Sequence, residues 1–119
     1  MKFQIVTNNP YVRDEYQDKY TVKFMDCTYG EVLQEVLVMC GQGYQLLTHP
    51  LSGSVKPNET PYKSIMVSAK PGNVDPQSID IMRKSLATYR KFPKLNVKWS
   101  DQAIEDFRLI DYTLISSAL

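Results

Sequence analysis

The sequence predicts an α/β fold, a layered sandwich in which a sheet of about four strands, mostly parallel or mixed, carries helices packed on it. Segments with strand character alternate with amphipathic helical segments, which is the order typical of a sheet covered by helices. The length of 119 residues fits one domain over residues 1–119. Apolar residues make up 43% and charged residues 23% of the chain, as in ordinary globular proteins.

Four short segments have the composition of strands, because they are rich in β-branched, aromatic or aliphatic residues. They are residues 3–7, 20–25, 44–48 and 64–68. The adjacent leucines of the third segment favour a central, buried position. No convincing helix separates the third and fourth segments, so the fourth strand is expected to be antiparallel and the sheet mixed.

Two helices are predicted from their starting residues. Thr28 and Glu31 have the spacing of a capping box, in which each side chain satisfies a backbone N–H of the other. Apolar residues on one arc follow between Val32 and Cys40. Further along, Asp75 precedes Pro76, the arrangement of an N-cap followed by proline in the first helical turn.

Two further helices are predicted at the ends of the chain. Pro10 begins a short helix through Tyr16, and Ser100 precedes a C-terminal helix. Asp111 lies at the edge of the buried face of that last helix, so we expect a neighbouring helix end or a lysine to hold it, with a functional acid as the alternative. The predicted buried face consists of Ala103, Ile104, Phe107, Ile110, Leu114 and Ile115.

Charge and composition exclude several function classes. Fourteen Lys and Arg against thirteen Asp and Glu give a net charge of +1, without the basic excess of nucleic-acid-binding domains, so no nucleic acid partner is expected. The chain lacks an apolar run of about 20 residues, so no membrane partner is expected either. Two cysteines and one histidine are too few for a structural zinc site. We expect no metal, no cofactor and, without a signal peptide, a cytoplasmic location.

The segment of residues 49–62 is the most unusual part of the sequence. It carries three prolines, one glycine and the only histidine. Loops of this length are uncommon in compact domains and are often functional, and proline restricts the backbone so that such a loop holds a shape. The segment contains neither a P-loop nor a GxSxG motif. It therefore predicts either a rigid structural loop or a ligand site.

A ligand site would form if strands 3–7 and 44–48 run in parallel, because their carboxyl ends then share one edge of the sheet. Hydroxyls, amides, backbone N–H groups and a lysine would there face a small anionic ligand. No catalytic residue is assigned, although catalysis through His49 stays open as the outside alternative. The expected ligand-binding residues are Asn8, Asn9, His49, Ser52, Ser54, Lys56 and Thr60.

An interaction role without enzymatic activity is the main alternative. The loop would then form a docking surface with four tyrosines that are expected to be exposed, Tyr11, Tyr16, Tyr29 and Tyr62, since tyrosine is enriched in protein interfaces. The sequence leaves open whether any reaction is catalysed, and a homo-oligomer is compatible with it.

The run from Leu46 to Ser64, together with the opening Val6–Pro10, resembles the GrdX family. GrdX proteins are small and are encoded beside the glycine reductase genes of anaerobic, amino-acid-fermenting bacteria. The resemblance extends over the whole chain in length and element order. It implies an accessory role, glycine reductase components as partners and a cytoplasmic bacterial setting. It implies no reaction and no catalytic residues.

Overall fold

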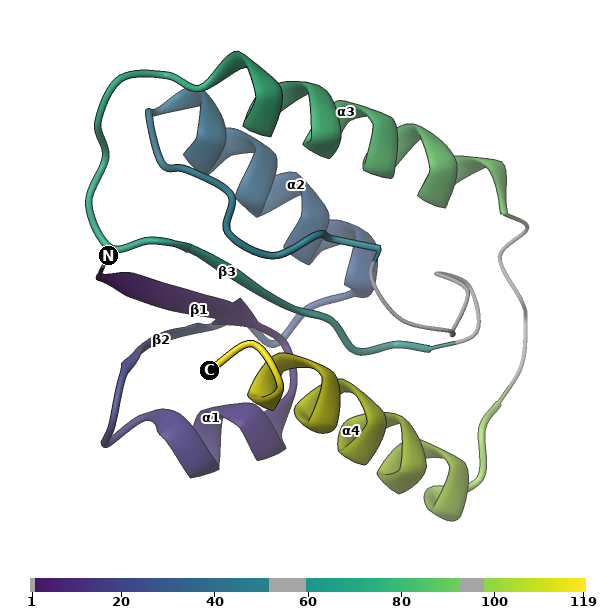
Figure 1. Ribbon diagram of the computed structural model, residues 1–119. Coiled ribbons are helices and arrows are strands. Elements are labelled where there is room, and N and C mark those ends of the chain that lie inside the picture. The colour runs from purple at the N-terminus through teal and green to yellow at the C-terminus, as the bar shows by residue number, and fades with distance from the viewer. Residues whose placement is uncertain (1, 52–59, 93–97) are drawn as a thin grey trace.

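A computed structural model describes residues 2–51, 60–92 and 98–119 (Figure 1). The described chain alternates strands and helices and ends in two helices. In order, the elements are β1 (Phe3–Thr7), α1 (Pro10–Tyr16), β2 (Thr21–Phe24), α2 (Tyr29–Gly41), β3 (Ser64–Ser68), α3 (Pro76–Lys91) and α4 (Asp101–Ser116). Within these described ranges, no helix is long and apolar enough to cross a membrane.

The sheet is mixed, as predicted, with the strand order β2-β1-β3. β1 and β2 are parallel and are joined through α1, whereas β1 and β3 are antiparallel. Thr7 at the end of β1 pairs with Ser64 at the start of β3. The chain therefore leaves β1 and enters β3 at the same edge of the sheet.

The predicted strand over residues 44–48 is wrong as a regular strand, so the described sheet has three strands where about four were expected. Leu46 forms only an isolated antiparallel bridge with Val67, and the Leu47 N–H donates to the Met66 carbonyl at 2.9 Å. The segment therefore lies beside β3, on the side away from β1, and runs in the same direction as β1.

Side chains take the place of ladder partners in this segment. The Leu46 N–H donates to the Ser78 hydroxyl at 3.0 Å, and the Met66 N–H donates to the Thr48 hydroxyl at 2.9 Å. In a β-ladder the Met66 N–H would donate to a carbonyl of the 44–48 segment, whereas the Leu46 N–H points away from β3 because the neighbouring Leu47 N–H donates to Met66. The polar side chains satisfy the backbone without completing a fourth strand.

Two helices cover each face of the sheet, α2 and α3 on one and α1 and α4 on the other (Figure 1). Alternate strand residues point to opposite faces. Val6, Ile65 and Val67 pack with α2 and α3, while Ile5 and Met66 belong to the second cluster. The helix side chains of that second cluster are Val12, Tyr16 and Ile115.

The predicted helix starts are confirmed. Thr28 and Glu31 form both halves of the capping box, and the side chains of Asp75 and Ser100 accept from the first turns of α3 and α4. Pro10 occupies the first turn of α1, with Asn9 as its N-cap. These starts depend on contacts within a few residues, so the local sequence determines them.

The predicted buried face of the last helix is only partly right. Ile115 is buried, but Ile110 and Leu114 are 42% and 36% exposed. Asp111, predicted at the edge of the buried face, is only 5% exposed. The polar contacts of Asp111 with the sheet turn this residue inward and leave two neighbouring apolar side chains outside.

Gly43 provides a test of the turn that follows α2. Its φ is +103°, and a Cβ there would lie 2.1 Å from the Gly72 carbonyl oxygen, so Gly43→Ala is strained in both backbone and packing. We expect a loss of about 2 kcal/mol or more in the free energy of unfolding, measured by urea titration. Gly41→Ala is the matched control, because nothing lies within 4 Å of its added methyl group and helix propensity favours alanine. Equal stability of Gly43→Ala and the parent chain would contradict this account.

Candidate functional site

The candidate site lies where β1 ends and β3 begins. Asn8 and Asn9 follow β1, and residues 60–63 lead directly into β3. Since Thr7 pairs with Ser64, these segments meet at one edge of the sheet although more than fifty positions separate them.

Asn8 fastens three segments together. Its Nδ2 donates to the carbonyls of Cys27 and Pro61 at 2.9 and 2.8 Å, and its Oδ1 accepts from the Lys63 N–H at 2.9 Å. The residue is buried. Both polar atoms of the amide thus hold neighbouring backbone in place.

Asn9 is buried and connects α1 with α4. Its Oδ1 accepts from the Tyr11 N–H at 3.0 Å as the N-cap of α1. Its Nδ2 donates to the Arg108 carbonyl at 2.9 Å and to the Asp111 carboxylate at 3.0 Å.

Asp111 is the centre of a buried polar cluster, which we call the Asp111 cluster and which comprises Thr7, Asn9, Ser64 and Asp111. The carboxylate accepts from the Ser64 N–H at 2.9 Å and from the Ser64 hydroxyl at 2.6 Å. The hydroxyls of Thr7 and Ser64 lie 2.6 Å apart. The first residue of β3 and the N-cap side chain of α1 therefore hold this carboxylate, so the expected helix end is part of the contact.

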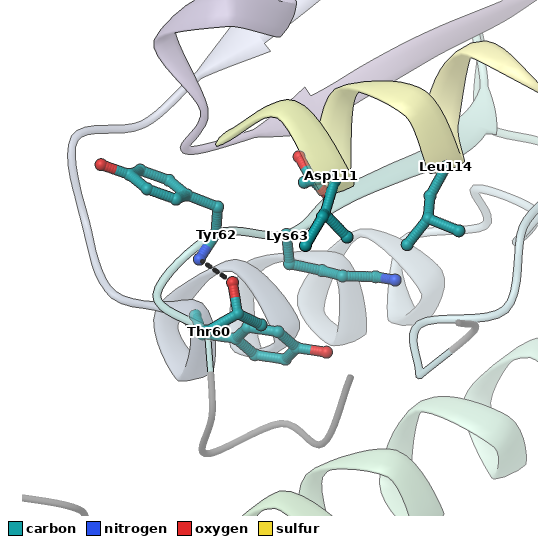
Figure 2. A pocket seen from close by; sticks show the side chains of 7 residues that line it. Thr60, Tyr62, Lys63, Asp111 and Leu114 are labelled. Carbon is teal, nitrogen blue, oxygen red and sulfur yellow. Dashed lines mark hydrogen bonds between the residues drawn. The ribbon is translucent and has the colours of Figure 1, made fainter. Parts of the chain in front are cut away.

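A small pocket opens beside the Asp111 cluster (Figure 2). Its cavity volume is about 20 Å³, enough for about one water molecule or an atom group of similar size. The lining residues are Tyr29, Thr60, Tyr62, Lys63, Ile110, Asp111 and Leu114.

Lys63 brings a buried amine to this pocket. Its side chain is only 4% exposed, and in Figure 2 it runs beneath Asp111 and Leu114. Burial lowers the pKa of the Lys63 amine, while the charge of Asp111 opposes the shift. A buried charged group with a perturbed pKa in a cavity wall is a candidate functional group.

Tyr29 contributes a neutral phenol to the same wall. Burial raises its pKa, and the nearby Asp111 and Tyr89 raise it further. The hydroxyl donates to the Pro50 carbonyl at 3.3 Å, and the ring stacks on Tyr89 with a centroid distance of 5.4 Å. Tyr29 therefore stays protonated and ties residues 49–51 to the pocket.

The predicted ligand-binding residues fall into three groups. Asn8 and Asn9 lie at the shared edge, and Thr60 lines the pocket while its hydroxyl accepts from the Tyr62 N–H at 3.2 Å (Figure 2). His49 accepts the Leu51 N–H through Nδ1 at 3.0 Å. Ser52, Ser54 and Lys56 lie outside the described residues.

Sequence reasoning did not assign Lys63 to the site. No local pattern distinguishes it, because its position depends on the distant Asp111 and Asn8. The expected exposure of four tyrosines is also wrong, since Tyr16 and Tyr29 are buried and Tyr11 and Tyr62 are half-buried. Tyr16 and Tyr29 pack their rings against other tyrosines in the two hydrophobic clusters.

Replacing Asp111 tests whether the Asp111 cluster holds the edge of the sheet together. Asp111→Ala leaves the buried N–H groups of Ser64 and Asn9 without their acceptor, and Lys63 loses its negative neighbour. We expect a loss of about 2–4 kcal/mol in the free energy of unfolding. Asp106→Ala, at an exposed position of the same helix, should change it by less than about 0.5 kcal/mol. Similar values for the two variants would contradict the role of the cluster.

The pKa of Lys63 predicts a dependence of stability on pH. Between its lowered value in the folded chain and the ordinary value of 10.5, the unfolded chain binds more protons at this residue. The free energy of unfolding of the parent chain, minus that of Lys63→Met, should therefore increase as the pH rises towards 10.5.

Urea titrations of both chains over this range measure the difference. Lys84→Met is the control with the opposite sign, because its hydrogen bond to Asp80 raises the pKa of Lys84. The stabilising effect of Lys84 is present at lower pH and is lost as the pH rises above 10.5. The prediction would be wrong if the free energy of unfolding of the parent chain, minus that of Lys63→Met, decreased as the pH rises.

Comparison with known proteins places the chain in a family. The family model described as GrdX-like protein matches residues 4–119, nearly the whole chain. No curated protein and no solved structure matches it. The chain belongs to the family of GrdX-like proteins.

Proposed function

We propose that this GrdX-like protein is an accessory protein that binds a small anionic ligand at the edge of the sheet shared by residues 7–9 and the 49–62 segment. The observation that carries the proposal is Lys63, a cation buried in the wall of a pocket. Thr60 adds a hydroxyl group to the same wall, whereas the Tyr29 hydroxyl already donates to the Pro50 carbonyl. Together Lys63 and Thr60 offer the charge and the hydrogen-bonding group that an anion needs.

The Asp111 carboxylate lies in the same wall, where it accepts three hydrogen bonds, two from Ser64 and one from Asn9. These bonds stabilise its charged form, and its charge acts on Lys63. A bound anion would therefore share Lys63 with Asp111. Lys63 sits in a poorly solvated position, where its attraction for an anion is less screened than at the surface.

The size of the pocket restricts the ligand. A cavity of about 20 Å³ accepts one small charged group, such as one end of a carboxylate, and leaves the rest of the ligand outside. Thr60 lines this pocket, and Pro50 is bonded to Tyr29 in its wall. We also propose that Ser52, Ser54 and Lys56 contact the part of the ligand that lies outside the cavity.

The setting of the proposal comes from the family resemblance. The resemblance implies a setting beside glycine reductase genes, so we propose small carboxylates of amino-acid fermentation as the first ligands to test, glycine and acetate among them. The ligand would be sensed or held by an accessory protein.

A thermal-shift measurement on the full chain tests ligand binding. Glycine, acetate, inorganic phosphate and a nucleotide are added separately at millimolar concentrations. At least one should raise the melting temperature, because a ligand that binds only the folded chain stabilises it. Lys63→Met should fold, since an apolar residue of similar volume replaces a buried charge, and should lose the response.

Lys70→Met is the matched control, because Lys70 is an exposed lysine outside the pocket. It should keep the response of the parent chain. The proposal fails if none of the four compounds raises the melting temperature, or if Lys63→Met responds as fully as Lys70→Met does.

A protein adaptor is the second candidate function, with glycine reductase components as its partners. The observation that favours it is the exposure of Ile110 and Leu114 on one side of α4, since exposed apolar patches mark interaction sites. Binding assays with purified glycine reductase components separate the two candidates. If the protein is an adaptor, the Lys63→Met variant should bind these components as tightly as the parent chain does.

A further inference from the structure

A second cavity lies between α1 and α4, outside the Lys63 pocket. Its volume is about 310 Å³, at the lower end of the range for ligand sites. We call it the α1–α4 groove. The residues that line it are Tyr11, Asp14, Glu15, Leu109 and Tyr112.

The α1–α4 groove and the Lys63 pocket lie on different sides of α4. Leu109 and Tyr112 line the groove, whereas Ile110 and Leu114 line the pocket. Positions one residue apart point in directions about 100° apart on a helix. The two cavities share no lining residue, so the groove can be considered without the proposed function.

Aromatic rings at this surface already attract cations of the chain itself. Arg108 lies 5.7 Å from the centroid of the Tyr11 ring, and the Lys19 amine lies 6.0 Å from that of Tyr16. Tyr112 stacks on Tyr16 at 5.8 Å and also faces the groove. Aromatic faces bind cations through their electron-rich centres.

The charge of the groove has the sign that a cation needs. Among its described lining residues are two carboxylates, Asp14 and Glu15, and no cationic side chain. Asp14 pairs with Arg13 at 2.8 Å, and Glu15 pairs with Lys19 at 3.4 Å. Both pairs are exposed and contribute little, so an incoming cation can exchange with them at small cost.

We propose that the α1–α4 groove docks an arginine-bearing segment of a partner polypeptide. The guanidinium group would stack on Tyr112 and Tyr11 and pair with the carboxylates of Asp14 and Glu15. Its aliphatic stem would cover Leu109, whose side chain is 47% exposed. Arginine fits this combination better than lysine, because its planar group both stacks on rings and pairs with carboxylates through two hydrogen bonds.

The test is an NMR titration of the full, ¹⁵N-labelled chain with the peptide acetyl-Gly-Arg-Gly-amide. The same peptide with citrulline, a neutral analogue of arginine, is the ligand control, and a lysine peptide is the third arm. Amide shifts should concentrate on residues 11–15 and 109–112. The citrulline peptide should bind at least about tenfold more weakly, with the lysine peptide between the two.

Variants connect the binding to the groove. Glu15→Gln should weaken arginine binding by about threefold or more. Asp80→Asn is the matched control, because Asp80 is also an exposed carboxylate in an i,i+4 pair with a lysine, but on α3. It should leave the affinity unchanged.

The proposal is wrong if the arginine and citrulline peptides bind equally well, or if millimolar arginine peptide causes no amide shifts. It is also wrong if the shifts spread over all acidic surfaces, or if Glu15→Gln and Asp80→Asn change the affinity equally. Concentration-dependent self-association that the same variants abolish would also overturn it, because the groove would then hold a second copy of the chain.

Discussion

The carboxylate of Asp111 is the contact on which the arrangement of the edge of the sheet depends. It accepts from Ser64, which begins β3, and from Asn9, which caps α1. One charged group on α4 therefore joins three elements that lie far apart in the sequence. A buried carboxylate is costly unless hydrogen bonds satisfy it, so these donors must stay in place while the chain is folded. The interaction fixes where α1 and α4 lie relative to the sheet.

The orientation of α4 follows from the same contact. Because Asp111 and Ile115 face the sheet, Leu109 and Tyr112 lie on one side of the helix and Ile110 and Leu114 on the other. Each side faces a different cavity. The Lys63 pocket and the α1–α4 groove are thus two consequences of turning a polar residue inward. The Lys63 pocket holds a buried amine beside the Asp111 carboxylate, and the groove holds two exposed carboxylates.

The parts of the fold that the sequence predicts correctly depend on near neighbours. The caps at Thr28, Asp75 and Ser100 act within a few residues, and β1 and β3 have compact apolar patterns. The strand expected over residues 44–48 depends on distant partners instead. Its backbone is satisfied by side chains such as Ser78, which sits 32 positions beyond Leu46. Apolar periodicity carries no information about such contacts, so it predicts neither the missing ladder nor the inward turn of Asp111.

The candidate site shows the same division between local and distant information. The sequence predicts that residues 7–9 and the segment after residue 48 come together, and Asn8 does bind the backbone at Pro61 and Lys63. Those bonds, however, occupy the amide groups that would otherwise face a ligand. The groups that line the pocket are instead Lys63, Thr60 and Tyr29, and Lys63 is there because Asn8 holds its backbone N–H. Asn8 thus holds the backbone of the residue that supplies the charge in the proposed anion site.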